Sequence, residues 1–207
     1  MKCFSLIILF ILFSCGNKEA VLLPKATITI VKKVEDHSPI YIFFRTKGKD
    51  TLTEVNRKNS IISTNWIFNI DKRLPLRLVI PEVMKLQQKK REEKAHKNEL
   101  AQNYFSYADT IGKNLAFIPF TKVFYKLEKP IGIVVFFNCK NEILLENQII
   151  KKEKLQQLIN NTLPENSAKL FLFRFDKDLN FGSYIQDKIF LESLKLPKLK
   201  QELEFIY

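Results

Sequence analysis

Apolar residues in the first 80 positions fall into short runs separated by polar turns, a pattern that predicts strands. Runs rich in β-branched and aromatic residues and bounded by charged or Gly-containing turns are typical of strands. They lie at 26–31 (ATITIV), 40–44 (IYIFF), 51–55 and 66–70 (WIFNI). The run at 40–44 is apolar at every position, which predicts a strand covered on both faces. The turn at 47–50 predicts a hairpin that joins it to 51–55.

From Pro81 the spacing of apolar residues becomes that of a helix. Pro81 and Glu82 suit a first helical turn, because proline lacks the N–H that would be unpaired there and Glu favours the positive end of the helix dipole. The stretch from Lys89 to Asn98 (KKREEKAHKN) has almost no apolar side. These features predict one long helix from Pro81 to about Tyr107 whose middle lies in solvent.

The second half of the chain alternates between expected strands and expected helices. Segments 116–119 and 122–127 are expected to form a hairpin, and 203–207 a final edge strand. The other strands are expected at 133–137, 143–145 and 170–175, and the helices at 152–163 and 181–194.

Parts of the first half recur in the second half, which suggests an internal duplication. One set of residues recurs 93 positions later: Ile40, Phe43, Phe44 and Lys47 as Ile133, Phe136, Phe137 and Lys140. Another set recurs 105 positions later: Phe68, Asp71, Lys72, Leu74, Ile80 and Leu86 as Phe173, Asp176, Lys177, Leu179, Ile185 and Leu191. The pattern predicts an α/β (α+β) protein of two related small units, each a mixed β-sheet covered by helices. Asp71 and Asp176 should then lie at equivalent strand ends.

The N-terminus carries the most specific motif. Lys2 precedes an apolar run at 4–13, and Leu12-Phe13-Ser14-Cys15-Gly16 closes it. The run is about half the ~20 residues that a spanning helix needs, so it reads as a processing signal. A cysteine after Leu-x-Ser resembles the lipobox of bacterial lipoproteins. That resemblance implies that residues 1–14 are a cleaved signal peptide, that Cys15 is acylated, and that 15–25 form a tether. The alternative is an ordinary secretory signal in which Cys15 is incidental.

The composition indicates a basic chain without an intrachain disulfide. Once Cys3 leaves with the signal and Cys15 is acylated, Cys139 stands alone, so no intrachain disulfide is expected. The formal charge of +12 suits an anionic surface. Only six of the 34 basic residues are Arg, the side chain that reads phosphate in a bidentate way. Export makes nucleic acid an unexpected partner, and a solvated Lys-rich surface with no ligand is the alternative.

The C-terminal part resembles a known periplasmic domain. Its residues 133–159 (IVVFFNCKNEILLENQIIKKEKLQQLI), followed by LFLFRFDKD at 170–178 and by Tyr184 with Ile185, are similar in order to ExbD/TolR-type biopolymer-transport accessory proteins. The chain is accordingly divided into an N-terminal unit at 26–128, with the long charged helix, and an ExbD/TolR-like unit at 129–207. The resemblance implies a small α/β binding module. It does not imply proton-driven work, because no membrane helix with the family's Asp is present.

No residue pattern indicates a catalytic, cofactor or metal site. His37 and His96 are the only histidines and stand far apart in the sequence, and no Cys-x-x-Cys pair occurs. Asp71, Asp176 and Asp178 follow predicted strands, a position typical of α/β sites. Such acids also accept backbone amides at turns, which is the interpretation we favour. Cys139 is interpreted as a buried small hydrophobe, with a reactive thiol as the alternative.

The sequence therefore predicts a lipid-anchored envelope protein that binds a partner without catalysis. Its contacts would be the membrane, through the lipid on Cys15, and another envelope protein. Gly16 after the acylated cysteine favours the outer membrane by resemblance to lipoproteins. One alternative is a hydrolase of envelope polymers, which needs Asp71 and Asp176 in one cleft within roughly 10 Å. Another is a basic protein that binds polyanions, which needs its lysines clustered on one face.

Overall fold

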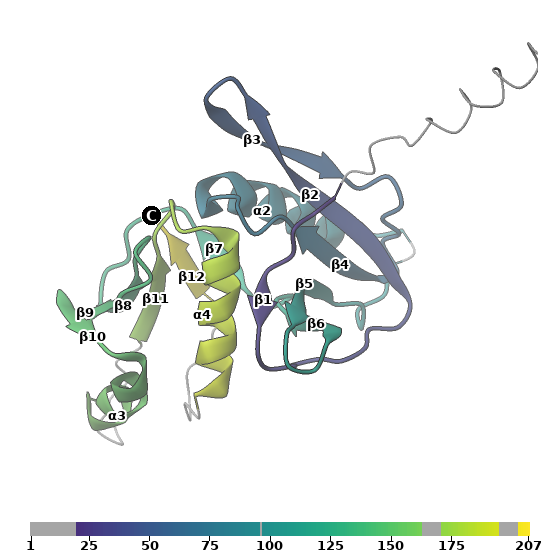
Figure 1. The fold of residues 1–207 in the computed structure, drawn as a ribbon. Coiled ribbons are helices and arrows are strands. Elements are labelled where there is room, and N and C mark those ends of the chain that lie inside the picture. Colours follow the sequence, from purple (N-terminus) through teal and green to yellow (C-terminus); the bar gives the residue numbers. More distant parts are fainter. Residues whose placement is uncertain (1–19, 96, 163–170, 195–202) are drawn as a thin grey trace, which may run out of the picture.

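The chain folds into two mixed β-sheets of six strands each with helices packed against them (Figure 1). This computed structural model describes residues 20–95, 97–162, 171–194 and 203–207. The predicted α/β class with two sheet-and-helix units is confirmed.

The first unit holds the first sheet and the longest helix. Its elements are β1 (Lys25–Ala26), β2 (His37–Lys47), β3 (Asp50–Asn56), β4 (Asn65–Ile70), α2 (Leu76–Glu92), β5 (Asn103–Asp109) and β6 (Asn114–Pro119). The strand order is β1-β5-β4-β2-β3, and β6 also pairs with β5. The β2–β3 hairpin forms as predicted, with Gly48 in its turn at φ 63°, a value that glycine adopts without strain.

The second unit holds the second sheet and two helices. Its elements are β7 (Phe124–Lys126), β8 (Ile133–Phe137), β9 (Ile143–Leu145), β10 (Gln148–Ile150), α3 (Lys152–Thr162), β11 (Phe171–Phe175), α4 (Phe181–Ser193) and β12 (Leu203–Ile206). The strand order is β10-β9-β8-β11-β12-β7.

The two units repeat one topology. In the first, β2 pairs with β3 in antiparallel and with β4 in parallel, and β4 pairs in parallel with β5. In the second, β8 has the same relation to β9 and β11, and β11 to β12. The amide of Asp71 donates to the Ile42 carbonyl, and the amide of Asp176 donates to the Phe137 carbonyl. The two aspartates therefore follow equivalent strands in equivalent registers, as the duplication requires.

A pseudo-two-fold contact joins the units where their long helices begin. Pro75 and Asn180 form an antiparallel bridge, and these residues stand 105 positions apart. On either side, the amide of Leu76 donates to the Leu179 carbonyl and the amide of Phe181 donates to the Leu74 carbonyl. Each unit thus satisfies backbone groups at the start of the other unit's helix, which would otherwise need caps.

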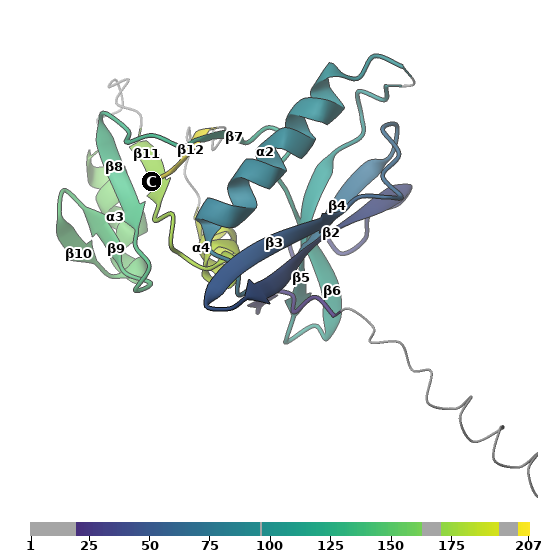
Figure 2. The ribbon, with the colours of Figure 1, turned by 90° about the horizontal axis from the view of Figure 1, so that it is seen from above.

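One hydrophobic core runs through both units. Ring centroids are 5.0 Å apart between Phe137 and Phe175 and also between Phe175 and Tyr184. The Tyr184 ring lies 6.3 Å from that of Phe105, which stacks on Phe120 at 3.7 Å. Figure 2 shows α2 and α4 between the two sheets, so that the units form one body.

The predicted helix from Pro81 to Tyr107 is wrong at both ends. The helix is α2, which starts five residues earlier because carbonyls of the other unit receive the amides of Leu76 and Arg77. It stops at Glu92, and the aromatic-rich segment Asn103–Asp109 is the interior strand β5. Lys90, expected in solvent, is buried, and its ammonium donates to the carbonyls of Thr64 and Gln102.

Several strand predictions also need correction. The expected strand at 26–31 is reduced to β1 and a single bridge from Val31 to Phe117. Segments 116–119 and 122–127 do not form a hairpin, because β6 joins the first sheet and β7 the second. The C-terminal strand β12 is interior, between β11 and β7, and β10 was not predicted.

The match of the two Phe-Phe pairs is wrong by two residues. Strand registers equate Ile42 with Phe137, an offset of 95 where the sequence comparison used 93. Phe43 and Phe137 are buried, whereas Phe44 and Phe136 are only partly buried. The guanidinium of Arg73 lies 4.2 Å from the ring centroid of Phe44, and that of Arg174 lies 4.0 Å from the ring centroid of Phe136. Arginine thus partly covers a sheet face where we had expected full apolar cover.

Candidate functional site

The predicted lipidation site, Cys15, and the rest of the lipobox lie outside the described residues. The chain is fixed to the fold from Leu22 onward. The Leu22 amide donates to the Asp71 carboxylate at 3.2 Å, and the Leu22 carbonyl accepts from the Lys72 amide at 2.8 Å. The carbonyls of Pro24 and Ala26 accept the amides of Ala108 and Thr110. The last residues of the expected 15–25 tether are therefore part of the first unit.

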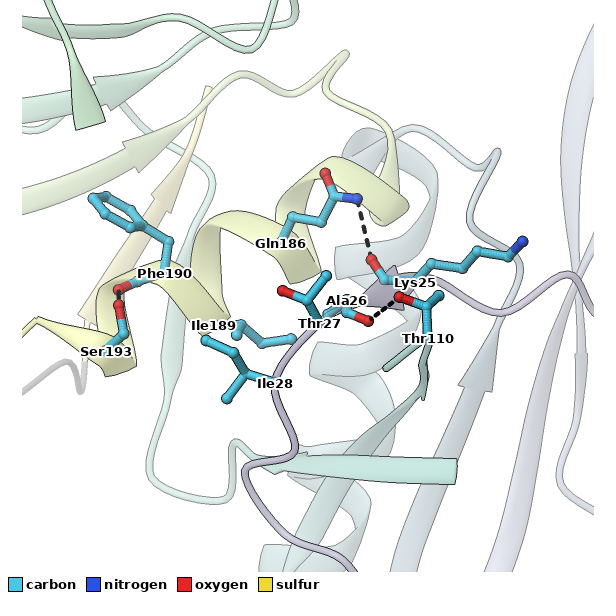
Figure 3. A pocket seen from close by; sticks show the side chains of 9 residues that line it. All are labelled: Lys25, Ala26, Thr27, Ile28, Thr110, Gln186, Ile189, Phe190 and Ser193. Carbon is cyan, nitrogen blue, oxygen red and sulfur yellow. Dashed lines mark hydrogen bonds between the residues drawn. The ribbon is translucent and has the colours of Figure 1, made fainter. Parts of the chain in front are cut away.

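A groove of about 440 Å³ lies between this N-terminal strap, residues 22–28, and helix α4 (Figure 3). Its lining combines apolar with small polar side chains: Lys25, Ala26, Thr27, Ile28, Thr110, Gln186, Ile189, Phe190 and Ser193. The Gln186 side chain donates to the Lys25 carbonyl at 3.1 Å and thereby ties the helix to the strap. Ile28 is 46% exposed although it belongs to the apolar part of the groove. The groove thus offers a contact surface with few charges.

The sequence did not predict this groove, because the residues of its two walls, 25–28 and 186–193, are about 160 positions apart. Ile28 lies within the β-branched run at 26–31, and its exposure of 46% is seen only in the structure, so the sequence carried no signal for the groove.

Asp71 has the structural role that we favoured. It is fully buried, and its carboxylate accepts the Arg73 guanidinium at 2.9 and 2.8 Å as well as the Arg73 and Leu22 amides. Burial raises the pKa of the Asp71 carboxyl, but the hydrogen bonds from Arg73 and Leu22 outweigh it and leave the pKa below its ordinary value. The carboxylate holds the turn and the strap together.

Asp176 occupies the equivalent place with a different set of donors. Its oxygens accept the amides of Asp178 and Cys139 at 2.9 and 3.3 Å. Asp178 pairs with Arg77 of the other unit at 2.8 Å. Neither Asp71 nor Asp176 lines the groove of Figure 3. Both carboxylates are engaged by turn amides, as in ordinary turn caps.

Cys139 is exposed, which corrects its interpretation as a buried hydrophobe. It lies in the turn after β8, beside Asp176. A hydrogen bond to the Asp176 carboxylate raises the pKa of the Cys139 thiol. A thiol held protonated is a weak nucleophile at neutral pH.

The second unit contains a buried polar network that the sequence analysis missed. The Lys188 ammonium pairs with the Glu204 carboxylate, which also accepts the Tyr184 hydroxyl at 2.7 Å. The Tyr184 hydroxyl lies 3.1 Å from that of Tyr125. Lys188 and Glu204 are 1% and 2% exposed. Burial, reinforced by the Glu204 charge, raises the pKa of both Tyr125 and Tyr184 well above the ordinary value. The signal was Glu204, the lone acid in the apolar run LEFI.

Of the two histidines considered as metal ligands, only His37 lies among the described residues. His37 begins β2 and its Nδ1 contacts the Val34 carbonyl at 2.9 Å, while His96 lies outside the described residues. Within the described ranges, no three His, Cys, Asp or Glu side chains gather in a way that could hold a metal ion.

Comparisons with protein-family models, with curated proteins and with solved structures found no match. None of the helices in the described part of the chain combines the length and apolar character needed to cross a membrane.

Proposed function

We propose that the protein is a lipid-anchored component of the bacterial cell envelope whose α/β body binds another envelope component without catalysis. The observation that carries this proposal is the Leu12-Phe13-Ser14-Cys15-Gly16 motif at the end of a short apolar run. Only six residues lie between Cys15 and Leu22, where the fold begins. Gly16 favours the outer membrane.

The anchor is tested by Cys15→Ala. Stable membrane attachment requires two or more acyl chains, because each buried CH₂ contributes only ~0.8 kcal/mol. We expect the wild-type protein to fractionate with membranes and to carry acyl mass on Cys15. The Cys15→Ala protein should remain an unacylated precursor. Acyl mass that persists in the variant would mean that another residue carries the lipid, and a wild-type chain that is cleaved but not acylated would indicate an ordinary secretory signal.

The groove between the strap and α4 is the proposed partner site. Small-molecule sites are typically concave and mostly apolar with a few polar groups, and we propose that a groove with such a lining also receives a segment of a protein partner. A photo-crosslinking residue at Ile28 should capture an envelope protein in intact cells. The matched control is Ile61, which is 59% exposed and is not among the lining residues. Equal capture at both positions, or none at Ile28, would contradict the assignment.

The C-terminal unit contributes to the proposal as a binding module only. Strand β8, strand β9, helix α3, strand β11 and helix α4 occur in the order on which the resemblance to ExbD/TolR-type domains rests, with the additional strand β10 between β9 and α3. Proton-coupled work is not carried over.

A further inference from the structure

Each unit has turns that follow parallel strands, and the start of its long helix, on one shared side of the molecule, whereas the turn after β5 lies elsewhere (Figure 1). This side, at the top of Figure 1, carries the turns after β4, β8 and β11 and the starts of α2 and α4. The β2–β3 hairpin adds to it. Strand β2 runs five residues past Ile42, the last position paired with β4, so its tip projects roughly 16 Å further. We refer to this side as the upper face.

The upper face is rich in lysines that have no acidic partner. These lysines come from the hairpin tip and from the turns after β4, β8 and β11: Lys47, Lys49, Lys72, Lys140 and Lys177. None forms an ion pair among the described residues. Among the acids of the same hairpin and turns, Asp71 pairs with Arg73 and Asp178 with Arg77, whereas Asp50, Glu142 and Asp176 form no ion pair among the described residues. The five lysines thus outnumber these three acids. The free charges on this face are therefore mainly positive.

The N-terminal chain leaves the fold from the same face. Leu22 is held by Asp71 and Lys72 in the turn after β4. From Leu22 to Cys15 is seven residues, which span about 25 Å at most when fully extended. A compact body of this size has a radius of gyration of roughly 16 Å, which corresponds to a diameter of about 40 Å, and so is wider than that reach. Acyl chains on Cys15 would thus keep the upper face close to the bilayer. The short chain between Cys15 and Leu22 would prevent the opposite face from contacting the bilayer.

We propose that the upper face rests on anionic lipid headgroups, whose phosphates pair with Lys72, Lys177 and the other unpartnered lysines. The inference rests on the proposed acylation of Cys15. Lysine is a compact point charge that suits a diffuse anionic surface. The Figure 3 groove lies further along α4 and the strap, away from this face, so it stays open to a partner.

Cys139 provides the probe for the test. It is exposed in the turn after β8 on the upper face, and it is the one thiol left once Cys15 is acylated and the signal is removed. The acylated full-length mature chain, purified from membranes, is labelled at Cys139 with a donor dye. It is then reconstituted into vesicles that carry a headgroup acceptor dye. Vesicles of phosphatidylcholine alone are compared with vesicles that also contain phosphatidylglycerol, at low and high salt.

Energy transfer from Cys139 should be stronger with phosphatidylglycerol, and high salt should remove the difference because it screens exposed charges. The double variant Lys72→Gln and Lys177→Gln should lower the ratio of headgroup-bound to unbound body roughly fivefold for each lysine. The matched double variant Lys113→Gln and Lys154→Gln removes the same charge from the β5–β6 turn and from α3, at the bottom of Figure 1. It should change the ratio little.

The inference would be overturned if energy transfer is the same with and without phosphatidylglycerol, or if it falls equally in both double variants. Failure of the anchor has a separate signature. An unacylated Cys15 appears in the mass of the purified chain, and the protein then fails to float with vesicles at high salt.

Discussion

The two units share one topology but fill equivalent core positions with opposite chemistry. The registers of β4 with β5 and of β11 with β12 equate Phe105 with Glu204. The offset of 105 between α2 and α4 equates the helix residues that face them. The first unit has Val79, Val83 and Phe105, and the second has Tyr184, Lys188 and Glu204; all six are buried.

The apolar trio contributes through area and shape. Phe105 stacks on Phe120 and meets the edge of Phe181 at 5.3 Å, so it ties the two units into one core. The polar trio instead contributes directional hydrogen bonds between β12 and α4, since Glu204 accepts from Lys188 and Tyr184, both on α4. The topology alone evidently does not dictate a polar core. A buried ion pair often adds little net stability, so we infer that this one contributes to specificity, by favouring the register of β12 between β11 and β7.

Removal of one member of the ion pair should have the largest effect on stability and tests the difference between the two units most directly. Glu204→Leu leaves the Lys188 ammonium buried without a carboxylate, which should lower the free energy of unfolding by about 3–5 kcal/mol. Urea denaturation followed by circular dichroism measures it. Trp66, the only tryptophan, lies in the first unit and reports that unit by fluorescence. Because the core is continuous, both signals should shift together.

A variant that removes both charges at similar volume is the control. Lys188→Met together with Glu204→Leu keeps the Tyr184 ring in the core and should recover most of that loss. A double variant as unstable as Glu204→Leu would show that packing around β12, and not the unpaired charge, is decisive. If the urea midpoint of the Trp66 fluorescence transition does not change while that of the circular dichroism does, the two units unfold independently.

The equivalent aspartates should also respond unequally. Asp71→Asn loses charged hydrogen bonds in a fully buried site and should lower the free energy of unfolding by about 2 kcal/mol. Asp176→Asn should cost only about 0.5 kcal/mol, because the site is partly exposed and an amide oxygen can still accept turn amides.

The pH dependence separates the two variants further. Since the pKa of Asp71 is lowered in the fold, its contribution is present above the unfolded pKa of about 3.9 and is lost as the pH falls through the folded pKa. Acid titration of stability should therefore be flatter in Asp71→Asn than in the wild type. Equal acid sensitivity in both proteins would contradict the role given to Arg73.

The sequence could predict elements whose formation depends on local pattern. The β2–β3 hairpin, β4, β8 and α4 follow from apolar runs and turn residues, and the repeated Asp-Lys turns gave the correct offset of 105. The Phe-Phe strands gave an offset wrong by two, because a strand slid by two residues keeps the same face inward and chance Phe matches then mislead.

The remaining features depend on contacts between distant segments. The start of α2 at Leu76 is set by carbonyls of Leu179 and Lys177, about a hundred residues away. Strand β5 was concealed because Tyr104, Phe105 and Tyr107 could continue a helical pattern as well as form a strand. The groove needs the strap and α4 side by side, which no local pattern encodes.

A second buried lysine sharpens the contrast between units. Lys90 of the first unit has carbonyl and amide oxygens as partners, whereas Lys188 has a carboxylate. Burial lowers the pKa of Lys90 to about 8. The unfolded state therefore binds more protons between pH 8 and the ordinary value near 10.4, so stability should rise with pH in this window. The free energy of unfolding of Lys90→Met should lack this rise. The wild type should therefore gain roughly 1–3 kcal/mol relative to Lys90→Met, as measured by urea denaturation from pH 7 to 10. A constant gap would mean that Lys90 keeps its charge throughout.

A last variant tests how far the polar network extends. Tyr125 is on β7, opposite Glu204 in the register, and reaches it only through the Tyr184 hydroxyl. Tyr125→Phe removes this outermost hydroxyl and leaves the Glu204 contacts with Lys188 and Tyr184 intact. The free energy of unfolding should fall by about 1 kcal/mol. Tyr184→Phe, which removes a direct donor to Glu204, should cost more. If the two changes cost the same and the double variant adds nothing, the hydroxyls act as one unit, and the network that distinguishes the second unit reaches from α4 across β12 to β7.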